Sequence, residues 1–441
     1  MEARIISRKM IKPAVPTPDH LRLCKLTFFD QLAPVDHIPF MQFYKANTGE
    51  QGENLQEKLL KSLSQTLIRF YPLAGRFIED GWYIDCNDMG AEYIESKVNV
   101  ELDEFLSIAP KNMHLLDHLV ARDNLKEISI LATTPILCLK VSTFSCGGIA
   151  ICTHLSHKLV DGFTAATFFR HWSNTCKSDH TISQEVVFPP HYGFDKLFST
   201  RDIPDAINPK HGSSKSFQEK LVTKTFVFDE EAISTLKSRL ANSIIITQPT
   251  RLEAVTSTVF KAIISATKSE KDVMFYCPVN LRGRSNLLKQ ANDNSLLCGN
   301  YCIAVPIKNK RDSSNKENVE VQDLVSLMRS RIRNVLDLCS RTSNPDDLFL
   351  EAAKNLGEII EEIGKEEEMD SVYYSSLCRF PFYEADFGWG KPEWVTTGGM
   401  ALELAFFMDT KRGNGISAMV CLQEERMLQF ECDHDIVAFT S

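Results

Sequence analysis

A histidine and an aspartate four residues apart form the local feature of this sequence best suited to chemistry. Residues 154–162 read His-Leu-Ser-His-Lys-Leu-Val-Asp-Gly, which puts His157 and Asp161 in the spacing His-x-x-x-Asp-Gly. A strand-like apolar run precedes this segment and a helix-like run follows it, so these side chains stand where a strand ends, a common position for functional residues. Because an imidazole titrates near neutral pH, His157 is a candidate general base.

The residues alone leave three interpretations of His157 open. It can be a structural histidine in the turn between a strand and a helix, a metal ligand together with His154 and Asp161, or an acid–base catalyst. Metal binding is the weakest of these, because residues three apart on a strand point to opposite faces and no fourth ligand stands out. In the catalytic interpretation, Asp161 could orient the imidazole ring as the aspartate of a catalytic triad does.

The elements that must position these residues follow from hydrophobic periodicity, which switches between helical and strand-like along the chain. Helices are predicted over 54–70, 163–174, 250–267, 317–339 and 350–368, and strands over 81–86, 137–144, 148–155, 221–228, 402–408 and 417–422. The segment 177–220 is rich in Ser, His, Pro and Asp and lacks periodicity, which is typical of a linker. The sequence therefore predicts an α/β protein with an N-terminal domain over 1–176, this linker, and a C-terminal domain over 221–441.

Composition narrows the class of protein. The 441 residues carry a formal net charge of −9, which disfavours a nucleic-acid partner, because phosphate binding needs a basic surface. We expect no membrane partner, since the chain starts without the apolar segment of a secretory signal and has no run of about 18 apolar residues. The 13 cysteines include no Cys-x-x-Cys pair, which indicates free thiols in a reducing compartment and favours a cytoplasmic protein.

A second motif, Asp386-Phe387-Gly388-Trp389-Gly390, lies near the end of the sequence. In combination with His-x-x-x-Asp-Gly it resembles the pair of motifs carried by the plant BAHD acyltransferase family. The resemblance extends over essentially the whole chain, through Phe-Tyr-Pro-Leu-Ala-Gly-Arg at 70–76, Asp-Cys-Asn-Asp at 85–88, Val-Asn-Leu-Arg-Gly-Arg at 279–284 and Cys-Arg-Phe-Pro-Phe-Tyr at 378–383. It favours the catalytic interpretation of His157 over the structural one.

This resemblance implies a fold and a mechanism. The fold would be two chloramphenicol-acetyltransferase-like domains with a solvent channel between them, and the protein would be a monomer. His157 would lie in the middle of the channel, with acyl-CoA entering from one face and the acceptor alcohol from the other. The histidine would take the proton of the hydroxyl as the oxygen attacks the thioester, without an acyl-enzyme, a metal or a tightly bound cofactor; acyl-CoA would be a co-substrate.

The resemblance also assigns roles to residues around the histidine. It implies that Asp161 points away from the channel and pairs with Arg282, so that both shape the site rather than react. Asp386 has been viewed in the family as a second proton acceptor; we favour a structural role, because it lies in a turn where nothing local would make it basic. The indole N–H of Trp389 is a candidate donor to the oxyanion, and a buried aromatic side chain closing the turn is the alternative.

The sequence also offers a candidate site for the phosphates of coenzyme A. It contains no glycine-rich phosphate loop, so a Rossmann or P-loop site is not expected. Thr250 and Glu253 form a capping-box pattern at the start of a predicted helix, and a helix N-terminus attracts phosphate. Thr250 and Arg251 are therefore candidate ligands, and a plain helix cap with a solvated arginine is the alternative.

Three further segments bear on the substrates. His-Ile-Pro-Phe at 37–40, Cys-Gly-Gly-Ile-Ala at 146–150 and Met-Asp-Thr-Lys-Arg-Gly at 408–413 resemble the branch of alkaloid and terpenoid O-acetyltransferases that includes vinorine synthase. Acetyl transfer from acetyl-CoA to a hydroxyl of an alkaloid or terpenoid is therefore expected. The Tyr-Phe-Gly-Asn-Cys pattern of malonyltransferases is replaced by Leu-Cys-Gly-Asn-Tyr at 297–301, which disfavours a malonyl donor. Malonyl or aromatic acyl donors, a hydrolase, and a catalytically silent metabolite-binding relative are the alternatives.

Overall fold

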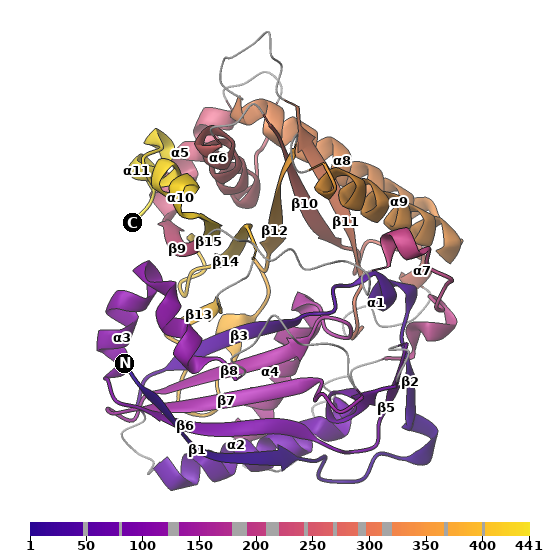
Figure 1. The fold of residues 1–441 in the computed structure, drawn as a ribbon, viewed down its shortest axis with the longest axis vertical. Helices are drawn as coiled ribbons and strands as arrows, with labels where there is room; N and C mark the ends of the chain where they lie inside the picture. Colours follow the sequence, from indigo (N-terminus) through magenta and orange to yellow (C-terminus); the bar gives the residue numbers. More distant parts are fainter. Residues whose placement is uncertain are drawn as a thin grey trace.

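The chain forms two large mixed sheets with helices packed on them, and the two halves lie one above the other in Figure 1. The computed structural model describes residues 1–46, 52–78, 82–121, 132–178, 192–208, 220–241, 246–267, 271–289, 297–310, 320–365, 369–398 and 402–441. Within these ranges a third, three-stranded sheet consists of β2 (Leu23–Lys25), β5 (Tyr83–Asp85) and β4 (Arg76–Phe77).

The lower sheet in Figure 1 carries the strand that leads to the histidine motif. Its strand order is β1 (Ala3–Ile11), β6 (Ala91–Val98), β7 (Leu137–Phe144), β8 (Ile149–Ser156), β3 (His37–Tyr44) and β13 (Trp394–Thr397). Strands β6 and β7 pair in parallel, and the other neighbours are antiparallel. Every residue of β8 is buried, and β7 and β3 flank this strand in the sheet. His157 therefore directly follows a buried strand in the interior of the sheet.

The helices of this half form from apolar residues at helical spacing. Helices α2 (Gly52–Arg69) and α4 (Gly162–Lys177) pack against each other, and the indole of Trp172 on α4 donates to the carbonyl of Leu59 on α2 at 3.3 Å. The short helices are α1 (Phe28–Leu32) and α3 (Leu102–Ile108). Burial of this apolar helix face anchors α4, whose first turn follows the histidine motif.

The upper sheet has the strand order β11 (Cys302–Asn309), β10 (Asp272–Asn280), β12 (Met369–Ser376), β14 (Leu404–Asp409), β15 (Ile416–Gln423) and β9 (Leu221–Phe228). Strand β12 pairs in parallel with both β10 and β14. The helices of this half are α5 (Glu230–Ala241), α6 (Arg251–Ala266), α7 (Asn286–Lys289), α8 (Val321–Arg341), α9 (Pro345–Ile363), α10 (Glu424–Glu431) and α11 (His434–Phe439). Helix α6 packs on the sheet through Phe260, whose ring stacks on Phe275 of β10 with centroids 3.6 Å apart.

The two halves exchange a segment. Strand β13 belongs to the C-terminal part of the chain, yet it pairs with β3 in the lower sheet, with Trp394 opposite Phe43. Phe382 and Phe387, which precede β13, are buried in the same core as the β3 residues. A domain boundary drawn between 176 and 221 therefore leaves this strand in the sheet of the other half, and the predicted linker itself lies largely outside the described residues, at 179–191 and 209–219.

Most predicted elements match observed ones. The predicted strands at 137–144 and 148–155 are β7 and β8, and the predicted capping box at Thr250 is present at the start of α6. The prediction of a helix beginning at 350 was wrong, because α9 begins at Pro345, after Asn344, whose side chain accepts from the backbone N–H of Asp346. Proline in the first turn and an asparagine cap are both favourable there, and they extend the helix toward its N-terminus.

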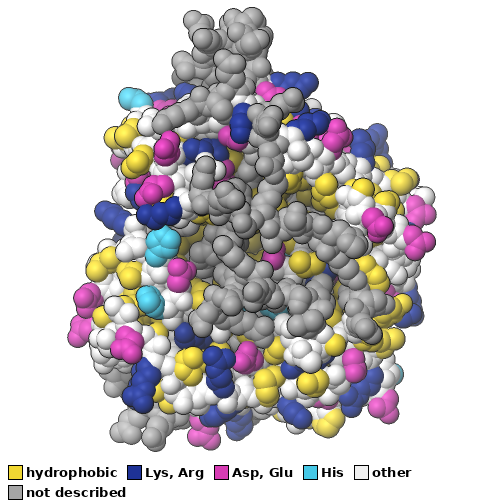
Figure 2. Space-filling view, in the orientation of Figure 1, with side chains coloured by type: hydrophobic (Ala, Val, Ile, Leu, Met, Phe, Trp, Pro, Cys, Tyr) yellow, Lys and Arg dark blue, Asp and Glu magenta, His cyan; other side chains and the backbone are white. Residues whose placement is uncertain are grey.

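The surface charges and the helices bear on possible partners of the protein. On the face drawn in Figure 2, Lys and Arg side chains are interspersed with Asp and Glu rather than gathered into an area of one sign. Among the helices of the described ranges, none combines the length and the apolar character needed to cross a bilayer.

Candidate active site

His157 is held by backbone hydrogen bonds directly after β8 ends. Its N–H donates to the carbonyl of Asp36 at 2.8 Å, and its carbonyl accepts from the side-chain amide of Asn300 at 2.7 Å. Asn300 is itself fixed, because its side-chain amide and its backbone N–H donate to Asp30 at 3.0 and 2.8 Å. The histidine backbone is therefore held by one segment from each half of the chain.

Burial keeps the imidazole of His157 neutral. Burial lowers the pKa of His157 below its usual value, and the carboxylates of Asp161 and Asp36 oppose that shift without reversing it. Burial disfavours the charged form of any group, which for a histidine means loss of its proton. A neutral imidazole can accept a proton, so the residue is in the state that a general base requires.

Asp161 is occupied by contacts other than His157. One oxygen of its carboxylate caps α4 by accepting from the N–H of Thr164 at 2.9 Å, and the other pairs with the guanidinium of Arg282 at 2.5 Å. The side chains of Asp161 and Arg282 are only 10% and 5% exposed. Arg282 also donates to the carbonyls of Gly299 and Leu297 at 2.7 and 3.0 Å. This buried ion pair ties the first turn of α4 to the segment after β10.

Gly162 allows the segment after β12 to approach α4. A β-carbon at this position would lie 2.3 Å from a methyl group of Leu377 and 3.1 Å from the ring of Phe380. The neighbouring Phe163 packs edge-on against Phe380 and receives the Arg282 guanidinium over its ring at 4.6 Å. The glycine after Asp161 is thus explained by close packing between the halves of the chain.

The Asp386–Gly390 motif folds into a turn at a distance from His157. Trp389 stacks on Phe387 and lies edge-on to Tyr44, with ring centroids 5.4 and 6.3 Å apart. Tyr44 pairs with the first residue of β8, Ile149, whereas His157 follows its last residue. At about 3.3 Å per residue, the eight steps from Ile149 to His157 correspond to about 26 Å.

Asp386 stabilises this turn. Its carboxylate accepts from the backbone N–H groups of Gly388 and Gly390, both at 2.9 Å, and pairs with Lys177 at 2.6 Å. Burial by itself would raise the pKa of Asp386, but the hydrogen bonds from Lys177 and the two glycines lower it below its usual value. A carboxylate with a lowered pKa is a weak base, and the Asp386 carboxylate already accepts hydrogen bonds from Lys177 and the two glycines.

Thr250 and Arg251 stand at the N-terminus of α6. Thr250 and Glu253 complete the capping box that the sequence predicts. The Arg251 guanidinium donates to the carbonyls of Gly413 and Gly415, both at 2.9 Å, and lies 3.4 Å from Asp409. Arg251 is therefore bound to the turn between β14 and β15, with its side chain still 38% exposed.

Two residues outside the sequence motifs contact His157. Asp36 and Asn300 hold the His157 backbone from two segments that are distant in the sequence. Neither residue carried a local sequence signal, since only the fold brings them to the histidine.

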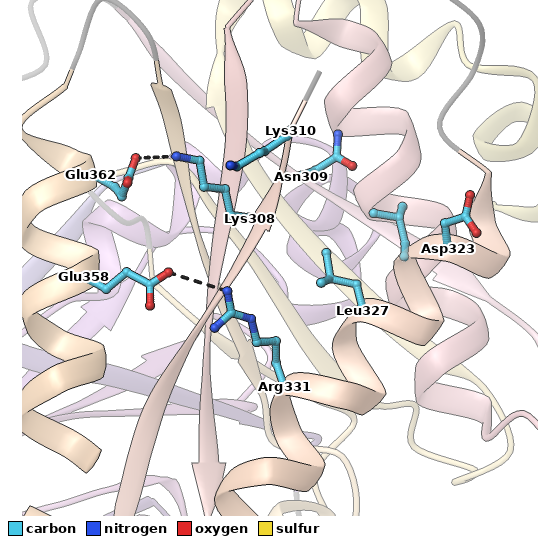
Figure 3. A pocket seen from close by; sticks show the side chains of 9 residues that line it. Lys308, Asn309, Lys310, Asp323, Leu327, Arg331, Glu358 and Glu362 are labelled. Atoms are coloured by element: carbon cyan, nitrogen blue, oxygen red, sulfur yellow. Dashed lines mark hydrogen bonds and ion pairs between the residues drawn. The ribbon is translucent and has the colours of Figure 1, made fainter. Parts of the chain in front are cut away.

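A surface hollow of about 500 Å³ between β11, α8 and α9 is distinct from this site (Figure 3). Four of its six charged side chains are paired, Lys308 with Glu362 at 2.8 Å and Arg331 with Glu358 at 3.7 Å. The hollow lies at the end of β11, whereas the start of that strand, Cys302, interacts electrostatically with Asp161. It therefore belongs to the far side of the C-terminal half.

Comparison with known structures defines the class of this protein. The crystal structure of vinorine synthase matches with a TM-score of 0.78 at 26% sequence identity, covering 100% of this chain and 99% of that one. The chain thus has the two-domain, chloramphenicol-acetyltransferase-like α/β architecture expected from the sequence.

Comparison with known sequences identifies the family. A family model described as the Transferase family matches residues 1–436. The chain is 32% identical over 455 residues to epi-neemfruitin B synthase of Melia azedarach, covering 100% of this chain and 99% of that protein. It is 30% identical over 460 residues to acetyl-CoA-benzylalcohol acetyltransferase of Clarkia breweri, covering all of both. The chain belongs to the BAHD acyltransferases and is an O-acyltransferase.

Proposed function

We propose that this enzyme transfers an acetyl group from acetyl-CoA to a hydroxyl of a plant alkaloid or terpenoid, with His157 as the general base. The observation that carries the proposal is the neutral imidazole held at the end of β8 by backbone hydrogen bonds to Asp36 and Asn300. Support for the acetyl donor comes from the relatives, which include acetyl-CoA-benzylalcohol acetyltransferase and a limonoid 1-O-acetyltransferase of Citrus sinensis.

The chemistry requires a base and a positioned pair of substrates. His157 takes the hydroxyl proton as the alcohol oxygen attacks the thioester carbonyl, a step to which a positioned base contributes about 10² to 10⁴-fold. The tetrahedral intermediate then expels the CoA thiolate, and the imidazolium returns the proton to the sulfur. Binding both substrates beside one histidine removes the entropic cost of their encounter. The ester and free CoA are the products.

The remaining residues receive supporting roles in this proposal. Asp161 and Arg282 hold the first turn of α4 in place behind His157. Asp386 and Trp389 act as structural residues of a turn, because β8 separates them from the histidine. Direct binding of CoA phosphates by Arg251 gains no support from its contacts with the β14–β15 turn, which favour the alternative of a structural helix start. A monomer that works in the cytoplasm stays a prediction.

Turnover by the purified enzyme tests the proposal. Acetyl-, malonyl- and benzoyl-CoA would each be incubated with a panel of alkaloid and terpenoid alcohols, free CoA thiol would be measured, and products would be weighed by mass spectrometry. We expect an acetyl ester, and a loss of at least about 10²-fold in kcat for His157→Ala. The matched control is His114→Ala, whose side chain is 62% exposed.

Each of the other outcomes contradicts a specific part of the proposal. An unchanged rate for His157→Ala would remove the histidine from the mechanism. Free acid without ester would make the protein a hydrolase, and release of no CoA with any donor would favour a silent binding protein. A preference for malonyl- or benzoyl-CoA would overturn the acetyl donor alone.

A further inference from the structure

Asp30 is a buried carboxylate on the short helix α1, and four donor groups converge on it. Its residue is only 2% exposed. One oxygen, Oδ2, accepts from the backbone N–H and the hydroxyl of Thr27 at 2.9 and 2.8 Å, which completes the capping box of α1. The other oxygen, Oδ1, accepts from the backbone N–H and the side-chain amide of Asn300 at 2.8 and 3.0 Å. The carboxylate therefore joins a helix of the N-terminal half to a residue of the C-terminal half.

These donors favour the ionised form of the carboxyl group. Burial raises the pKa of Asp30, and the hydrogen bonds from Asn300 and Thr27 act in the opposite direction. An ionised carboxylate only accepts hydrogen bonds and offers about four acceptor positions, which matches the four donors. An asparagine at position 30 would turn an N–H group toward one of the donor pairs and leave buried polar groups unsatisfied, which is costly.

Asn300 connects the Asp30 carboxylate to the candidate base. The Nδ2 atom of Asn300 that donates to Asp30 also donates to the backbone carbonyl of His157 at 2.7 Å. Both of these neighbours are oxygen acceptors, which fixes the orientation of the amide group. Because the backbone N–H of Asn300 is bound to the same carboxylate, this side chain is held at both ends. The position of the His157 carbonyl therefore depends on Asp30 through one intervening residue.

The next residue of the chain, Lys158, is held by the same helix. Lys158 is fully buried, and its ammonium group donates to the carbonyls of Gln31 and Asp30 at 2.7 and 3.2 Å. Carbonyl groups in the last turn of a helix lack partners within the helix and accept such donors. The peptide bond between His157 and Lys158 is thus fixed from two sides. Asn300 holds its carbonyl oxygen, and α1 holds the side chain that follows.

We propose that Asp30 is a positioning residue of the active site, which holds Asn300 and through it fixes the backbone of His157 for proton transfer. This inference rests on the proposed function, because it concerns the same general base. Two buried carboxylates then have separate tasks around the histidine. Asp161, with Arg282, shapes the turn that follows His157, whereas Asp30 holds the histidine itself. Misplacing a catalytic group by about 1 Å can cost about 10²-fold in rate, so loss of this hold should slow the chemical step.

Turnover and backbone protection of the full-length chain test the proposal. Rates with acetyl-CoA and benzyl alcohol would be measured for the wild type, Asp30→Asn, Asn300→Ala and the double variant. Glu403→Gln is the matched control, because Glu403 is also a buried carboxylate, 4% exposed, and it binds Arg426 of α10 in the other half. Hydrogen–deuterium exchange of the peptides that cover His157 would be followed by mass spectrometry without substrates, and urea unfolding would report the stability of each variant.

We expect kcat and kcat/KM to fall together in Asp30→Asn, by at least about tenfold, because the loss concerns the chemical step rather than the binding of acetyl-CoA. The double variant should be no slower than Asn300→Ala, because Asp30 acts through Asn300. Exchange around His157 should become faster in Asp30→Asn. The Glu403→Gln control should lose stability, keep its rate and show unchanged exchange around His157.

An unchanged rate in Asp30→Asn, or additive losses in the double variant, would overturn the inference. Equal losses of rate in Asp30→Asn and Glu403→Gln would assign the effect to stability and would overturn it as well. A wild type that esterifies neither benzyl alcohol nor any alcohol of the panel would contradict the proposed function, and the exchange measurement then decides this inference. Faster exchange around His157 in Asp30→Asn alone would support the hold on the histidine, and unchanged exchange would overturn it.

Discussion

Replacing Arg282 by methionine would leave the Asp161 carboxylate buried without its cation. The guanidinium contacts this carboxylate and the carbonyls of Gly299 and Leu297, and the Arg282 side chain is only 5% exposed. Methionine preserves much of the volume but supplies no donor. After the substitution, Asp161 would keep the α4 cap and a 3.3 Å contact with the N–H of Tyr301.

The expected loss of unfolding free energy follows from the burial of both Asp161 and Arg282. Removing one member of a buried ion pair costs about 3 to 5 kcal/mol, because the other charge stays desolvated. Changing Asp161 to asparagine as well removes that charge, and asparagine is also a good helix cap. We therefore expect the double variant to lose about 2 kcal/mol less than the sum of the single variants. Breaking the exposed Lys220–Glu424 pair, which spans 2.9 Å, should cost less than about 1 kcal/mol.

Urea unfolding of the four variants measures these differences. The free energy of unfolding would be compared for wild type, Arg282→Met, Asp161→Asn and the double variant, with Lys220→Met as the exposed control. Strictly additive costs for the two single changes would refute the reasoning, and so would a cost of Arg282→Met no larger than that of Lys220→Met. Because the pair holds the turn behind His157, we also expect kcat/KM to fall in Arg282→Met.

Two further predictions concern the histidine motif. The pKa of His157 is lowered from its ordinary value of about 6.5. We therefore expect kcat/KM to be constant at neutral pH and to fall only below about pH 6.5, as the base becomes protonated. A pH–rate profile whose acidic limb is centred above that value would contradict this prediction. In Gly162→Ala the new β-carbon would lie 2.3 Å from Leu377. We therefore expect the free energy of unfolding, measured by urea titration, to fall by about 1 to 3 kcal/mol. An unchanged urea midpoint would contradict the close packing at this position.

Local elements of the fold were predictable where neighbouring residues decide them. Strands β7 and β8 and the capping box at Thr250 follow from periodicity and from side chains three residues apart. The pairing of β13 with β3 was not predictable in this way, because its residues are more than 300 positions apart along the chain. Hydrophobic pattern identifies a strand but does not specify which distant strand will accept its hydrogen bonds.

Some residues of the candidate site were likewise predictable from the sequence, and others were not. His157 stood out from its residue type and motif, whereas the pairing of Asp161 with Arg282 was expected only from the family resemblance. Asn300 and Asp36 gave no local signal, although both form hydrogen bonds with the histidine backbone. Their contribution depends on atoms that the folded chain alone places within 3 Å of His157.

By itself, the sequence determined the α/β character, most helices and strands, the histidine proposed as the base and the family to which its motifs point. These are properties of residue type and short-range spacing. The tertiary structure decided that Trp389 and Asp386 lie at the opposite end of β8 from His157, that Arg251 is bound to a turn, and that Asp36 and Asn300 hold the histidine backbone. Burial and long-range contacts set the protonation state and surroundings of a side chain, and neither exists until the two halves of the chain have packed together.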